Sequence, residues 1–158
     1  MAATELKSEL IMQRLVSILD DIHPDNGDYW NDMSQGQVIR YLLDLDSAIS
    51  LDTKPIIEVL SGTEDIEHLT TNHRELSQFE ITIIGYVKSE DPQLIATLVS
   101  RLVKDVMKVI YADITLNDLC RTVHVRSVVT DEGELSYREH GQFEMTISVE
   151  YDFIWDNL

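Results

Sequence analysis

A strict alternation of apolar and polar residues near the end of the sequence constrains the fold more than any other feature. Every second side chain between positions 143 and 153 is apolar, in the order Phe143, Met145, Ile147, Val149, Tyr151 and Phe153. The side chains between them are polar or acidic: Glu144, Thr146, Ser148, Glu150 and Asp152. Successive side chains of a β-strand point to opposite faces of its sheet. This segment therefore predicts a long strand with one face in the core and one wet, acidic face.

A second segment, residues 92–110, has the periodicity of an amphipathic helix. Its apolar side chains recur every three or four positions and form a broad stripe: Ile95, Leu98, Val99, Leu102, Val103, Val106 and Ile110. Asp91 is a suitable N-cap, and Pro92 suits the first helical position, where its missing N–H costs little. The same periodicity predicts another helix over residues 5–22, with Thr4 as its N-cap.

The remaining elements are shorter, and their order indicates the fold class. Three more strands are predicted at residues 56–60, 79–87 and 123–129. Three segments follow neither period: an irregular arm or short helix at 29–54, and long loops at 61–78 and 131–140. Helices and strands do not alternate singly, which disfavours a doubly wound parallel sheet. We therefore predict one α+β domain over residues 1–158, with two main helices packed on one face of a four-stranded antiparallel or mixed sheet.

The chain is strongly acidic, and this bears on its partners rather than on its fold. It has 29 Asp and Glu residues against 12 Lys and Arg, a formal net charge of −17 at pH 7. Such a charge repels nucleic acid and anionic membrane surfaces, so neither is expected as a binding partner. A single cysteine, Cys120, leaves no disulfide within the chain, and the first residues lack the apolar core of a signal peptide. We expect the protein in the cytoplasm, or in a larger assembly built there.

The sequence contains none of the common catalytic motifs. GxGxxG, the P-loop, HExxH, CxxC and GxSxG are all missing. Cys120 has His124 as its nearest histidine in sequence, and a small buried side chain is the simpler interpretation of this cysteine. His124 and His140 could face each other across the last hairpin, where a cross-strand polar pair is the simpler interpretation. We therefore predict no enzyme, no metal site and no cofactor.

Two sets of side chains are candidates for a functional surface. The acidic set shares the polar faces of the predicted strands and consists of Glu80, Glu144, Glu150 and Asp152. The second set combines apolar bulk on a polar strand face with basic residues on the second helix: Ile84, Tyr86, Arg101, Lys104 and Lys108. A solvated helix face explains the basic residues, and contact with an acidic neighbouring subunit is the alternative. Cover by the 29–54 arm or a subunit contact would explain Ile84 and Tyr86.

An ordered series of short phrases adds a resemblance to a known family. The phrases are PIIEVL at 55–60, FEITIIGYV at 79–87, the Asp-Pro start of the second helix, YADITLNDLCRTVHV at 111–125, a Thr-Asp-Glu-Gly turn and FEMTISVEYDF at 143–153. Together they resemble the bacteriophage tail terminator and tail-completion proteins, including the minor tail protein U family. The resemblance covers residues 55–153 and, more loosely, the first helix.

This resemblance implies a structural role in a virion. It implies a homo-oligomeric ring, commonly a hexamer, that docks on the last ring of tail-tube protein, stops polymerisation and presents a surface to head-connector or stopper proteins. The ring would sit at the head-proximal end of the tail after assembly in the host cytoplasm. DNA would pass through without specific binding, and the acidic set would face the channel because like charges repel. The 61–78 and 131–140 loops would contact neighbouring subunits or the tube.

Two other classes of protein remain open at this point. One is another structural part of the virion, such as a head–tail connector or a tail-tube protein, because the same fold elements suit it. The other is a small acidic binding or inhibitor protein that mimics DNA.

Overall fold

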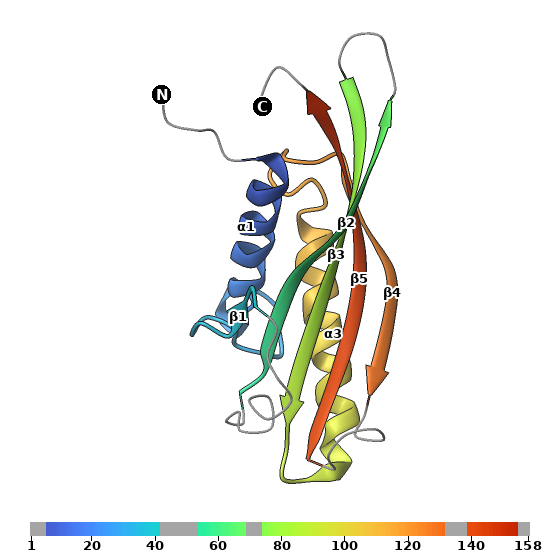
Figure 1. Cartoon of the computed structure of the whole chain (residues 1–158). Helices are drawn as coiled ribbons and strands as arrows, with labels where there is room; N and C mark the ends of the chain where they lie inside the picture. The colour runs from blue at the N-terminus through green and yellow to red at the C-terminus, as the bar shows by residue number, and fades with distance from the viewer. Residues whose placement is uncertain (1–5, 42–53, 69–73, 132–138, 155–158) are drawn as a thin grey trace.

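The computed structural model describes residues 6–41, 54–68, 74–131 and 139–154 (Figure 1). These residues form an α+β fold in which two helices pack on one five-stranded mixed sheet. The helices are α1 (Lys7–Asp20) and α3 (Ile95–Ala112). The strands are β1 (Val38–Ile39), β2 (Ile56–His68), β3 (Arg74–Lys88), β4 (Thr122–Asp131) and β5 (His140–Ile154). The predicted N-cap Thr4, most of the 131–140 connection and residues 42–53 of the predicted arm lie outside the described residues.

The sheet has one strand more than the sequence predicted. Its order is β1-β2-β3-β5-β4, with β1 parallel to β2 and all other pairs antiparallel. The prediction missed β1 because a strand of two residues has no periodicity to detect. The four predicted strands are confirmed, and β5 runs from His140 to Ile154 with its strict alternation of buried and accessible side chains intact over most of its length.

The long exposed loop predicted at 61–78 is wrong for the residues that the structure describes there. Residues 61–68 continue β2 and residues 74–78 begin β3, so both belong to an antiparallel pair. All side chains from Ser61 to Glu67 are exposed, so no alternation of burial marks this strand in the sequence. The strand conformation comes instead from the backbone ladder to β3, which pairs on its other side with β5. We call residues 61–68 and 74–78 the distal arm.

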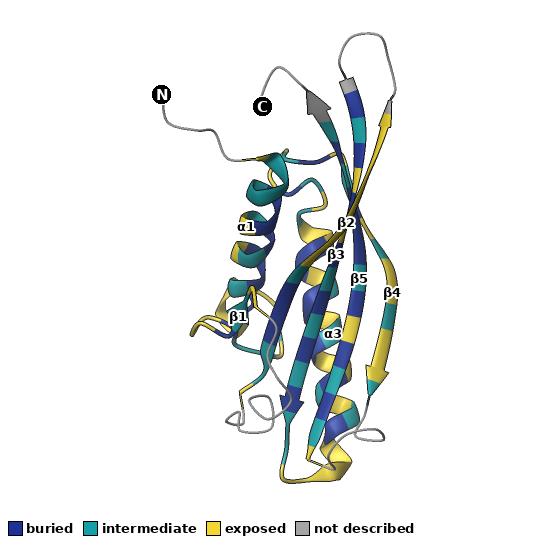
Figure 2. Cartoon of the chain, in the orientation of Figure 1, coloured by how far each residue is buried: buried dark blue, intermediate teal, exposed yellow. Residues whose placement is uncertain are grey.

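One face of the sheet and the apolar stripes of both helices form a single core (Figure 2). The sheet contributes mainly alternate residues of its central strands: Phe79, Ile81, Ile83, Val87, Phe143, Met145, Ile147, Val149 and Tyr151. The helices contribute Ile11, Met12, Leu15, Ile18, Leu19, Ile95, Val99, Leu102, Val106 and Ile110. Full burial of a Leu, Ile or Phe side chain stabilises a fold by about 1.5–3 kcal/mol, so this cluster dominates the folding energy.

Gly85 shows how closely the central strands pack. It lies opposite Phe143 in the β3–β5 register. A Cβ atom placed on Gly85 would lie 2.1 Å from Cε1 of the Phe143 ring. Glycine in a strand commonly marks such a close approach, and here it makes room for the phenylalanine ring.

α1 begins and ends two residues inside its predicted limits, whereas α3 begins three residues after its predicted start and ends two residues beyond its predicted end. Asp91 acts as the predicted N-cap, because its Oδ1 accepts a hydrogen bond of 3.0 Å from the backbone N–H of Gln93. The capped turn, Pro92–Leu94, is a 3-10 turn, and α3 begins after it at Ile95. A proline at the first position of such a turn leaves no N–H without a partner.

The distal arm projects beyond the helices. Figure 1 shows β2 crossing in front of the other strands, with the distal parts of β2, β3 and β5 continuing past the upper ends of α1 and α3. This crossing reflects the right-handed twist of paired strands. Between Ser61 and Glu64 the β2–β3 register shifts, which is the irregularity that a β-bulge produces in an antiparallel pair.

Candidate interaction surfaces

One face of the sheet carries all four carboxylates of the predicted acidic set. These are Glu80, Glu144, Glu150 and Asp152. In the register Glu80 lies directly opposite Ser148, and the other three residues have the same parity as Ser148 along β5. Directly opposed residues of paired strands share a face. This face points away from the core, and we call it the outer face.

The four carboxylates are spread along the outer face rather than gathered. Glu144 and Asp152 lie about 27 Å apart along β5 at the usual rise of about 3.4 Å per residue. Asp152 is neutralised by Arg121, whose Nη2 lies 2.7 Å from Asp152 Oδ1. Glu150 accepts a hydrogen bond of 3.3 Å from Gln78. Glu80 and Glu144 are exposed, and neither forms an ion pair with a described residue.

The distal arm adds two carboxylates that sequence reasoning assigned to a loop. Asp65 lies opposite Gln78, which lies opposite Glu150, so Asp65 belongs to the outer face. By the same parity Glu67 lies on this face. Both side chains are exposed, and neither forms an ion pair with a described residue. Only the strand register reveals this extension of the acidic surface, because the sequence around these residues shows no apolar alternation.

The predicted interface residues Ile84 and Tyr86 also lie on the outer face, where both are half-buried. Ile84 lies opposite Glu58 on β2, and the Glu58 side chain is 0% exposed. The pKa of Tyr86 is raised well above its usual value, first by burial and then by the charge and hydrogen bond of Glu58. The sequence did not single out Glu58. This part of the outer face is therefore partly covered and differs from the open surface around Glu144.

The predicted basic residues lie on the solvent side of α3. Arg101, Lys104 and Lys108 are all exposed, and two of them stack on aromatic rings. The Arg101 guanidinium lies 4.4 Å from the centroid of the Trp30 ring. Lys108 Nζ lies 4.9 Å from the centroid of Tyr29 and donates a hydrogen bond of 2.9 Å to the Asp28 carbonyl. We call Trp30, Arg101, Lys104 and Lys108 the basic-aromatic patch.

A buried carboxylate that the sequence did not predict holds this patch together. Asp105 lies in the apolar stripe of α3 and is 1% exposed. Its carboxylate accepts hydrogen bonds from the backbone N–H groups of Trp30 and Asn31, at 3.0 and 2.9 Å, and from Asn31 Nδ2 at 2.8 Å. A buried carboxylate is tolerated when such donors satisfy it. Asp105 therefore fixes the loop that carries Trp30 to the side of the helix.

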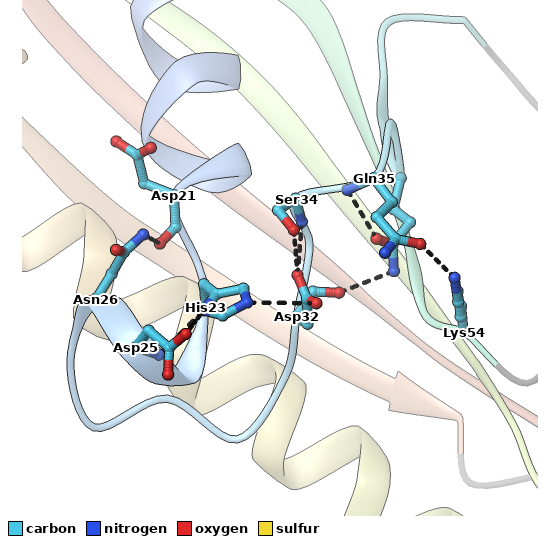
Figure 3. A network of polar contacts seen from close by, with 9 residues as sticks. Asp21, His23, Asp25, Asn26, Asp32, Ser34, Gln35 and Lys54 are labelled. Carbon is cyan, nitrogen blue, oxygen red and sulfur yellow. Dashed lines mark hydrogen bonds and ion pairs between the residues drawn. The ribbon is translucent and has the colours of Figure 1, made fainter.

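A polar network braces the same loop at its other end (Figure 3). His23 Nδ1 accepts a hydrogen bond of 3.0 Å from the Asp25 N–H, and His23 Nε2 lies 3.5 Å from Asp32. Asp32 in turn accepts hydrogen bonds from the Ser34 hydroxyl and N–H, which lower the pKa of the Asp32 carboxyl. The Gln37 amide donates 2.9 Å to the Asp32 carbonyl and 3.1 Å to that of Pro55, which ties the loop to the start of β2.

The patch borders an open hollow of about 370 Å³. Its lining comes from the Trp30 loop and one side of α3: Trp30, Ala96, Thr97, Ser100, Arg101 and Lys104. Trp30 is 62% exposed, which is unusual for so large an apolar side chain. Trp and Arg are the residue types most enriched among those that dominate protein–protein binding energies. A protein segment of negative charge is the kind of partner that these side chains suit.

The patch differs in its electrostatic state from three arginines elsewhere in the described chain. Arg14, Arg40 and Arg121 each form an ion pair, with Asp113 at 2.8 Å, Glu9 at 2.5 Å and Asp152 at 2.7 Å. The Arg40 hydrogen bond is also the main cause that lowers the pKa of Glu9. Within the described parts of the chain, the three cations of the patch form no ion pair.

A second polar network lies on the inner face of the distal arm. The Glu64 carboxylate accepts hydrogen bonds from the Ser77 hydroxyl, at 2.5 Å, and from the Tyr151 hydroxyl. Burial, followed by the hydrogen bond to Glu64, raises the pKa of Tyr151 to about 12. Ser77 and Glu75 are buried beside them. Hydrogen bonds thus take the place of apolar packing at this end of the sheet.

The sequence also singled out one cysteine and two histidines. Cys120 is buried, as predicted, and its pKa is raised to about 11 by burial and by the nearby Asp113 charge. His124 lies opposite Ser148 and His140 opposite Lys88, so the two histidines do not form the cross-strand pair that the sequence suggested. No group of three or more His, Cys, Asp or Glu within the described ranges is placed to hold a metal ion.

Among the helices that the structure describes, none is long and apolar enough to cross a membrane. No protein-family model matches this chain, and no curated protein matches it.

Proposed function

We propose that this chain is a structural subunit of a bacteriophage tail that closes the end of the tail tube as a homo-oligomeric ring. The family resemblance implies that the ring is a hexamer. The observation that carries the proposal is the separation of charge across the subunit. Carboxylates on the outer face of the sheet and cations on α3, which packs on the other face, form no ion pair with any residue that the structure describes. Subunits of a ring need two different complementary surfaces, because each contact is heterologous.

The outer face suits a channel through which DNA passes. Glu80 and Glu144 are exposed there and form no ion pair with a described residue, and Glu80 lies between Glu144 and Glu150 along the sheet. Carboxylates along such a wall repel phosphate and keep the DNA from adhering. Asp152 contributes less to this field, because Arg121 neutralises it. The helix side would then be turned away from the channel.

The first test compares tails made with and without the chain. A phage that lacks the gene is expected to produce overlong tails, and electron microscopy measures their length distribution. Loss of a tail-tube protein would leave no tails, and loss of a connector would leave tails of normal length that are not joined to heads. Either of these results would contradict the terminator role. A DNA-mimicking inhibitor would leave the tails unchanged.

The second test examines the channel. Glu80→Lys combined with Glu144→Lys is expected to slow DNA ejection while rings remain intact. Glu90→Lys combined with Glu139→Lys is the matched control, because it makes the same change of charge at exposed residues outside the set. Equal ejection rates for the two double variants would exclude the outer face from the channel.

A further inference from the structure

We infer that the basic-aromatic patch is the docking site for the distal arm of a second copy of this chain. The inference deepens the proposed function and rests on it, because it names the contact that joins neighbouring subunits. Three properties of the two surfaces carry it: the patch is preorganised, its cations form no ion pair with a described residue, and the carboxylates of the arm form none either.

The patch is held rigid before any partner arrives. Asp105 fixes the backbone of Trp30 with hydrogen bonds of 3.0 and 3.2 Å, and Arg101 is stacked over the indole ring at 4.4 Å. A side chain that is already ordered loses little conformational freedom on binding. The exposed Trp30 indole ring therefore lies in a fixed position beside the 370 Å³ hollow, with cationic side chains next to it.

The distal arm has the complementary chemistry. Asp65 and Glu67 are exposed on its outer face and form no ion pair with a described residue. Between them, Ile66 points to the other side of the strand and is 50% exposed. An edge strand with an exposed apolar side chain and flanking carboxylates suits a partner that offers both an aromatic surface and cations.

The two surfaces cannot meet within one subunit. Figure 1 shows the arm continuing past the upper ends of both helices, whereas Arg101 and Lys104 lie near the middle of α3. An arm that contacts the patch must therefore belong to another copy. Because the two surfaces differ, the contact repeats from head to tail, and it closes into a ring when the rotation between copies allows.

Charge reversal on each side tests the contact. The patch variant carries Arg101→Glu with Lys104→Glu, and the arm variant carries Asp65→Lys with Glu67→Lys. Light scattering at low salt measures the mass of each, and circular dichroism checks that each is folded. We expect association of either variant alone to weaken by about 10-fold or more, because like charges then face each other.

An equimolar mixture of the two variants provides the decisive measurement. In the mixture the acidic arm of the patch variant meets the basic patch of the arm variant, and the basic arm meets the acidic patch. Alternating assemblies are therefore expected to recover. A single-residue comparison supplies the control. Lys104→Glu is expected to lower the mass of the assembly. Arg126→Glu makes the same change of charge at an exposed residue of β4 outside the patch and is expected to leave the mass unchanged.

The outcomes separate this inference from the proposed function. If the natural chain forms rings and both reversed variants form them equally well, the contact between arm and patch is refuted, whereas the proposed ring is not. If both folded variants stay monomeric in the mixture, the arm and the patch are not partners. If the natural chain remains a monomer at every concentration and does not associate with tail tubes, both proposals fail together.

Discussion

The two halves of the sheet are stabilised by different physical means. Where the sheet lies against α3, its inner face is apolar, and Ile81, Ile83 and Phe143 are completely buried. At the distal end the same face carries Glu64 and Ser77 of the arm and Tyr151 of β5, joined by hydrogen bonds. Apolar packing is strong and insensitive to direction, whereas buried polar groups must meet partners in a defined geometry. The first half supplies stability, and the second supplies a defined position for the arm.

This contrast bears on the contact that we infer between the arm and a second copy of the chain. A strand whose side chains from Ser61 to Glu67 are all exposed gains little from burial. The bonds from Tyr151 and Ser77 to Glu64 anchor the base of the arm to β5 and β3. We expect the arm to exchange its amide protons faster than the core strands, because local stability follows buried apolar contacts.

The largest expected effect comes from the core half. Phe143→Ala is predicted to lower the free energy of unfolding by about 3–5 kcal/mol, because it leaves a cavity among completely buried residues. Urea unfolding followed by circular dichroism measures the change. Gly85→Ala alone should cost about 1–3 kcal/mol by overpacking against the phenylalanine ring. In the Phe143→Ala background Gly85→Ala should lower the free energy of unfolding much less. If the two losses were additive, the phenylalanine side chain would not be what excludes a larger residue at position 85.

An intermediate effect is expected in the arm. Tyr151→Phe removes a hydroxyl that donates to Glu64 and should lower the free energy of unfolding by about 1–2 kcal/mol. The raised pKa of Tyr151, about 12, makes this contribution dependent on pH. It is complete below the unfolded value of about 10 and is lost as the pH rises toward 12, because the folded state holds the proton more tightly. The stability difference between the natural chain and Tyr151→Phe, measured from pH 9 upward, should follow this course. A difference that stays constant above pH 10 would contradict the assigned hydrogen bond.

The smallest effect is expected at the ion pair near the start of β4. Arg121→Gln removes the partner of Asp152, and both side chains are partly exposed, at 52% and 31%. Surface pairs of this kind contribute about 0.2–1 kcal/mol and weaken in salt. Unfolding at low and at high salt should therefore differ more for the natural chain than for the variant. If Arg121→Gln lowered the free energy of unfolding by more than about 2 kcal/mol at high salt, this contact would contribute more than a surface ion pair does. The two halves of the sheet would then differ less than described.

The predictability of each element follows from how it is stabilised. The alternation in residues 143–153 and the stripe in α3 predicted their elements correctly, because burial of one face selects apolar residues at a fixed period. The distal arm was predicted as a loop, since a strand held by its backbone ladder places no such demand on its side chains. Asp105 was missed for a related reason. A single carboxylate in an apolar stripe shows its role only when the Trp30 loop is placed beside it.

The sequence by itself determined the fold class, the core-facing residues of the long strands, the net charge and the side of α3 that carries the cations. These properties are encoded locally, in composition and in periods of two and 3.6 residues. Only the tertiary structure decided which charges are neutralised, how far the acidic surface extends into β2, and that Trp30 stands beside Arg101. Such facts depend on contacts between residues far apart in the chain, which no local pattern records. The hydrogen bonds from the Trp30 loop to Asp105 span about 75 positions of the sequence.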